Sequence, residues 1–160
     1  MCMSLHRRCR ANLFRGDESR QFVRRANEQM AVVALMLFLT HISGCIGALE
    51  QSITSSMHKA PPMCTVLSYI GATRVVTSHG AFGGETRKML QLFSPAKLFL
   101  SKMQRKAPKR TVGPDASLVS RKGKRFTGKA KNMKISQRYT PAYGRAFADA
   151  YLAQRAALNV

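Results

Sequence analysis

The sequence predicts a small, mainly α-helical protein with little independent core. Two short amphipathic helices are expected at about residues 95–106 and 141–158, joined by an extended basic connector. An apolar helix over residues 30–49 is expected to precede them. Three observations give this prediction: an uncharged apolar run in the first third of the chain, two Ser/Thr-Pro helix starts in the second half, and an unevenly spread net charge of +20.

The charge divides the chain into segments. There are 27 Lys and Arg residues against 7 Asp and Glu residues, and the net charge is +4 over residues 1–29, zero over 30–86 and +16 over 87–160. Hydrophobic residues make up 45% of the chain, so it is not simply a disordered polybasic tail. The charge of a compact body of this size would be strongly self-repelling without a polyanion nearby. A basic arm (1–29) and a basic binding module (87–160) are therefore expected at the two ends.

Residues 30–49 carry no formal charge and allow three interpretations. As a helix they would be roughly 30 Å long, about the thickness of a bilayer core. They could form a membrane span, because arginines crowd the N-terminal flank. They could form the hydrophobic region of a signal peptide, because small residues such as Ser43 and Gly44 follow the strongest apolar run. The third interpretation is a buried core helix.

Residues 50–86 are rich in Ser and Thr and nearly free of acid, a composition that organelle transit peptides share. This predicts a targeting-like or linker segment and a location in an organelle, either a plastid or a mitochondrion. If residues 30–49 are retained as a span, the location would be an organellar membrane. The competing interpretation is a pair of strands at residues 65–70 and 74–77, separated by a turn at Gly71.

The first amphipathic helix is predicted by its boundaries and one apolar face. Ser94 and Pro95 form a cap followed by proline at the first helical position. Phe99 and Met103 recur on one face, and the residue before Pro108 leaves the α region, which ends the helix.

The last helix begins with the same signature at Thr140 and Pro141, and most of its other positions are alanine, a strong helix former. An apolar stripe with helical spacing is interpreted as a packing surface, docking partly on helix 95–106 and partly on a larger assembly. Its members are Tyr143, Phe147, Tyr151 and Leu158.

The connector has the pattern of a polyanion-binding segment. Residues 102–138 contain thirteen basic residues and one acid, interleaved with glycines. Closely spaced Lys and Arg can each neutralise a phosphate, and Phe126 could stack on an unpaired base. The predicted nucleic-acid-binding residues are Lys109, Arg110, Arg121, Lys122, Lys124, Arg125, Phe126, Lys129, Lys131, Lys134 and Arg138.

Motifs for catalysis and metal binding are missing from the sequence. The four cysteines lie within the first 64 residues without CxxC spacing, and no histidine pairs with them at zinc-ligand spacing. No phosphate-binding loop, nucleophile elbow or metalloprotease motif occurs, and acids are too scarce for an acid/base pair. We therefore expect no enzyme activity, no metal, no cofactor and no small-molecule substrate.

These features predict a non-catalytic structural RNA-binding subunit of a ribonucleoprotein, with an organellar ribosomal-type protein as the preferred case. Its partners would be RNA, most of all rRNA, and neighbouring subunits. RNA is favoured over sequence-specific DNA reading because no zinc finger, basic zipper or helix-turn-helix is evident. The alternative is a basic linker or accessory subunit of a respiratory or photosynthetic membrane complex, anchored by residues 30–49.

Overall fold

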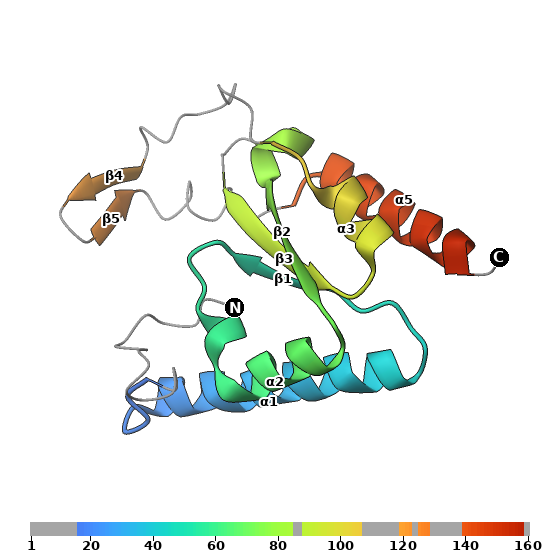
Figure 1. The fold of residues 1–160 in the computed structure, drawn as a ribbon. Helices are drawn as coiled ribbons and strands as arrows, with labels where there is room; N and C mark the ends of the chain where they lie inside the picture. The colour runs from blue at the N-terminus through green and yellow to red at the C-terminus, as the bar shows by residue number, and fades with distance from the viewer. Residues whose placement is uncertain (1–15, 85–87, 107–118, 123–124, 129–138, 159–160) are drawn as a thin grey trace. The chain divides into compact units, whose positions relative to one another are not determined.

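The computed structural model describes residues 16–84, 88–106, 119–122, 125–128 and 139–158, without the side chains of 119–122 and 125–128 (Figure 1). Its elements in chain order are α1 (Gln21–Ile42), β1 (Leu49–Ser52), η2 (Met57–Lys59), α2 (Pro61–Tyr69), β2 (Thr73–Ser78), η3 (His79–Phe82), β3 (Met89–Ser94), α3 (Lys97–Met103), β4 (Val119–Lys122), β5 (Arg125–Gly128) and α5 (Pro141–Leu158).

Two sheets accompany the helices, so the prediction of a mainly α protein is confirmed only in part. One sheet has three strands in the order β1-β3-β2, and the other is the antiparallel pair β4-β5. The chain divides into two compact units, described separately below. Unit 1 is Met1–Arg74 with Leu92–Lys97, and unit 2 is Val75–Gln91 with Leu98–Val160.

Helix α1 runs from Gln21 to Ile42, so it begins and ends earlier than the apolar helix predicted at 30–49. Its end is fixed by a Schellman motif, in which Gly44 adopts a φ of 69°. The Cys45 N–H donates to the Thr40 carbonyl at 3.0 Å, and the Gly44 N–H donates to the His41 carbonyl at 3.0 Å. Among the described residues, no helix has both the length and the apolarity needed to span a bilayer.

The core of unit 1 lies between one face of α1 and the elements that follow it. Met30, Ala34 and Leu37 of α1 are buried there with Met63 and Leu67 of α2. The other buried members of this cluster are Leu49, Met57, Ala60, Ile70 and Phe93. One face of α1 is therefore buried in this core.

The region between residues 50 and 86 contains regular structure that the sequence indicated only in part. The strand considered at residues 65–70 is wrong, because this stretch belongs to α2, which begins with prolines at its first positions. Strand β2 confirms the second strand of that pair. Gly71 lies between the two elements with a φ of 64°, a conformation that glycine adopts without strain.

In unit 2 the two predicted amphipathic helices are present, with different accuracy. Helix α5 matches the predicted range 141–158, whereas α3 is shorter than the predicted 95–106. The Gln154 side chain of α5 accepts hydrogen bonds from the Leu98 and Phe99 amides of α3, at 3.0 and 3.2 Å. First-turn amides lack partners within their own helix, so α5 supplies the cap that α3 needs.

Thr140 anchors the start of α5 by two hydrogen bonds. Its hydroxyl accepts from the Tyr143 amide at 3.1 Å and donates to the Phe82 carbonyl at 2.6 Å. We expect Thr140→Ala to lower the free energy of unfolding by about 1–2 kcal/mol, because the cap is lost and the Phe82 carbonyl loses its donor. Urea denaturation measures this loss. Thr140→Ser should retain most of the stability, and an equal loss in both variants would contradict the capping role.

His58 of η2 is expected to make unit 1 sensitive to acid. Its ring lies 5.1 Å from that of Phe93, and burial lowers the pKa of His58 below its usual 6.5, with Lys59 and Arg74 lowering it further. Between the lowered pKa and 6.5, the unfolded chain binds more protons at this position than the folded chain. This contribution to stability is therefore complete above pH 6.5 and is lost as the pH falls through the lowered pKa.

We expect the free energy of unfolding to decrease on acidification from pH 7 to pH 5, and the decrease to be smaller in His58→Gln, which cannot be protonated there. Urea denaturation at a series of pH values measures the two slopes. Identical slopes for the variant and the unsubstituted protein would rule out His58 as a source of the acid sensitivity.

Candidate nucleic-acid interface

Four of the predicted binding residues lie on the antiparallel pair β4-β5. The register pairs Arg121 with Phe126 and Lys122 with Arg125. The connector predicted as merely extended therefore contains a paired two-stranded segment. This pairing determines which cationic and aromatic positions lie opposite each other.

The composition of this pair is unfavourable for an isolated hairpin. Its strands have the sequences VSRK and RFTG, with three basic residues and no acid. Like charges at facing register positions, as at Lys122 and Arg125, destabilise a strand pair. A polyanion bound along the strands would offset this repulsion, which makes β4-β5 the candidate nucleic-acid interface.

Seven other predicted binding residues lie outside the described residues, so the structure neither groups nor separates them. They are Lys109, Arg110, Lys124, Lys129, Lys131, Lys134 and Arg138.

The apolar stripe of α5 packs partly within its own unit. Tyr143 is buried with its ring 5.1 Å from that of Phe82, and the Phe147 ring lies 4.9 Å from that of Phe99 in α3. Tyr151 is half-buried, and Leu158 is 63% exposed. The contact between Phe147 and Phe99 is the docking on the first amphipathic helix that the sequence predicted.

An exposed tyrosine that the sequence analysis did not select lies at the end of the connector. Tyr139 is 47% exposed, and its ring lies 5.0 Å from Tyr143 and 5.7 Å from His79. The Lys88 ammonium is 5.5 Å from the centre of the Tyr139 ring. Rings from η3 and α5 therefore support Tyr139 within unit 2, and a cation lies next to it. Its position after the last connector arginine was the available sequence signal.

The turn after η3 encloses the histidine that supports Tyr139. Gly83 has a φ of 74°, and the Gly84 amide donates to the His79 carbonyl at 3.1 Å. A Cβ at Gly84 would lie 2.7 Å from that carbonyl oxygen and would also collide with the imidazole. Only glycine fits at this position, because the backbone passes directly against the buried His79.

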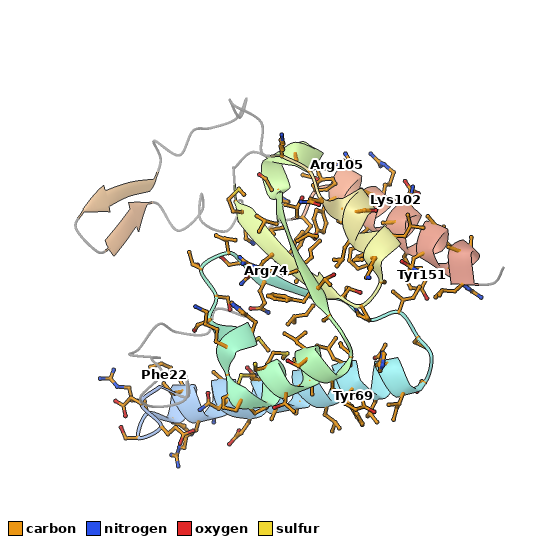
Figure 2. All side chains as sticks on the ribbon, viewed as in Figure 1. Phe22, Tyr69, Arg74, Lys102, Arg105 and Tyr151 are labelled. Atoms are coloured by element: carbon orange, nitrogen blue, oxygen red, sulfur yellow. The ribbon has the colours of Figure 1, made fainter. Side chains whose placement is uncertain are left out.

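Unit 2 presents cations with very little acid around them. Its described residues include nine Lys and Arg, and Asp149 is the only described acid. Lys102 and Arg105, labelled in Figure 2, are exposed residues at α3 and directly after it. The Arg105 guanidinium lies 4.6 Å from the centre of the Phe82 ring, a cation–π contact that restricts its position.

In the described part of the chain, no group of three or more His, Cys, Asp and Glu residues could hold a metal ion. No protein-family model, curated protein or solved structure matches the chain. The candidate interface is therefore argued from its own residues.

Proposed function

We propose that the protein is a non-catalytic RNA-binding subunit of a ribonucleoprotein, with an organellar ribosomal-type protein contacting rRNA as the specific case. The observation that carries this proposal is the register of β4-β5, which places Lys122 opposite Arg125 and Arg121 opposite Phe126. In this register positions 122 and 125 share one face of the strand pair, so two neighbouring cationic residues are available to one phosphate backbone.

The charge distribution supports a polyanionic partner over a small acidic ligand. Residues 87–160 carry a net charge of +16, and these cations repel one another. A bound nucleic acid would neutralise them, and the counterions condensed on its phosphates would be released. A single acidic metabolite would neutralise only a few of these charges. A polymer with one charge per nucleotide matches both the number of the cations and their spread along the chain.

The aromatic residues support single-stranded RNA within that class. Tyr139 offers a half-exposed ring backed by Tyr143 and His79, with Lys88 beside it. Unpaired bases stack on such rings while neighbouring cations bind the phosphates. We assign Tyr139 as a stacking residue alongside the candidate Phe126, and Lys88 as a phosphate contact.

The charge of β4-β5 can be tested by reversal. We expect Lys122→Glu/Arg125→Glu to weaken binding of a single-stranded oligouridylate at least tenfold at moderate salt. The slope of log K against log salt should become shallower by about 1–2, because two phosphate contacts are lost. Fluorescence anisotropy at a series of salt concentrations measures both quantities.

Arg24→Glu/Arg25→Glu in α1 is the matched control, because it changes the net charge by the same amount in unit 1. It should leave the salt slope nearly unchanged. Equal effects of the two double variants would show a response to net charge alone and would remove β4-β5 as the interface.

The stacking role of Tyr139 can be tested apart from charge. Tyr139→Ala should weaken oligouridylate binding by about 1–3 kcal/mol, because one base loses its aromatic support. Tyr139→Phe keeps the ring and should bind nearly as tightly as the unsubstituted protein. Anisotropy titration gives the affinities, and circular dichroism verifies that both variants fold. Unchanged affinity in Tyr139→Ala would exclude the stacking role.

A further inference from the structure

Helix α1 has a second apolar face that no described residue covers. Val32, Leu35, Met36, Leu39 and Ile42 are each between 47% and 62% exposed. Their spacing of three, four and seven residues places them on one side of the helix, opposite the buried Met30, Ala34 and Leu37. We call these five residues the outer face of α1.

The size of the outer face distinguishes between occupants. Its five side chains expose roughly 500 Å² together, which is at the upper end of what monomeric proteins leave open to water. A stable dimer buries about 800 Å² on each partner, so this face alone is too small for one. A second copy would also bring another net charge of +20 next to the first.

The charges around the outer face favour an anionic occupant. Arg24 and Arg25 are exposed in the first turns of α1, where Glu28 is the acid. Just before the helix, Arg20 is paired with Asp17 at 3.1 Å and Glu18 follows Asp17, and residues 1–29 together have a net charge of +4. Arg25, Val32 and Leu39 follow one another at seven-residue intervals, so the cationic end and the apolar part share one side of the helix. Four further arginines precede residue 16 in the sequence.

We propose that the outer face of α1 docks on the surface of an anionic lipid bilayer. The helix lies along the membrane with its apolar side chains at the boundary between headgroups and acyl chains, and Arg24 and Arg25 contact lipid phosphates. Tyr69 of α2, labelled in Figure 2, is 65% exposed with its ring 5.3 Å from Phe38 of α1. Such an amphipathic ring suits the headgroup level. This membrane contact is independent of RNA binding.

The natural chain contains no tryptophan, so a single introduced tryptophan can report the contact by its fluorescence. In the full-length protein, Met36→Trp places it on the outer face. With vesicles of phosphatidylcholine containing roughly 30% phosphatidylserine, its emission should shift to shorter wavelength as the ring leaves water. The shift should persist with saturating oligouridylate, which occupies the basic interface of unit 2. No shift, or a shift that the oligouridylate abolishes, would overturn the proposal.

Co-sedimentation with the same vesicles tests the residues. Leu35→Gln/Leu39→Gln should weaken vesicle binding about tenfold or more, because two apolar side chains that would enter the bilayer are replaced by polar ones, while RNA affinity stays unchanged. Arg24→Gln/Arg25→Gln should weaken it severalfold, with less salt dependence. The matched control, Leu98→Gln/Leu152→Gln, changes two exposed leucines of unit 2 and should leave vesicle binding unchanged.

Two results would overturn the assignment. If Leu35→Gln/Leu39→Gln sediments like the unsubstituted protein, the outer face is not the contact. The second result is that the unsubstituted protein does not bind vesicles but self-associates in the ultracentrifuge, whereas Leu35→Gln/Leu39→Gln is monomeric. In that case the outer face binds a second copy of the chain. If the unsubstituted protein binds vesicles but not the oligouridylate, the proposed function is wrong and the membrane contact still holds.

Discussion

The excess of positive charge limits where this chain can build a core. An unpaired cation in an apolar interior is costly, so the neutral stretch of residues 30–86 supplies most of the packing in unit 1. In unit 2 many of the buried side chains come from short segments that interrupt the basic sequence, such as α3 and the inner side of α5. None of the Lys and Arg side chains that the structure describes is buried, so an anionic partner could compensate their charge.

Local signals in the sequence predicted the helix boundaries that capping residues and proline set. Thr140 and Pro141 gave the start of α5 because capping and proline geometry act within one turn. The range of α1 was predicted less well, because an apolar run reports burial and not helicity, and arginine also favours helices. Strand β3 was missed because all of residues 90–94 are buried, polar Gln91 and Ser94 included, so the segment lacks the regular apolar/polar alternation of a half-buried strand.

The candidate site was predictable in composition but not in arrangement. A run of basic residues indicates a polyanion, yet only the register shows that Lys122 and Arg125 face each other. The support of Tyr139 by His79 joins residues far apart in sequence, and the Thr140 hydroxyl reaches the Phe82 carbonyl 58 positions away. Periodicity and spacing describe neighbours along the chain, so neither of these contacts can be inferred from them.

The cap that Gln154 provides to α3 has a kinetic consequence. The Gln154 side chain caps the Leu98 and Phe99 amides, which lie 56 and 55 positions earlier in the chain. This cap of α3 therefore forms only after a long loop closes. Most of that loop is the basic connector, whose charges repel one another and oppose closure. Salt that screens these charges should therefore accelerate the docking of α5. Under the proposed function, binding of a polyanion to the connector would therefore also favour completion of the fold.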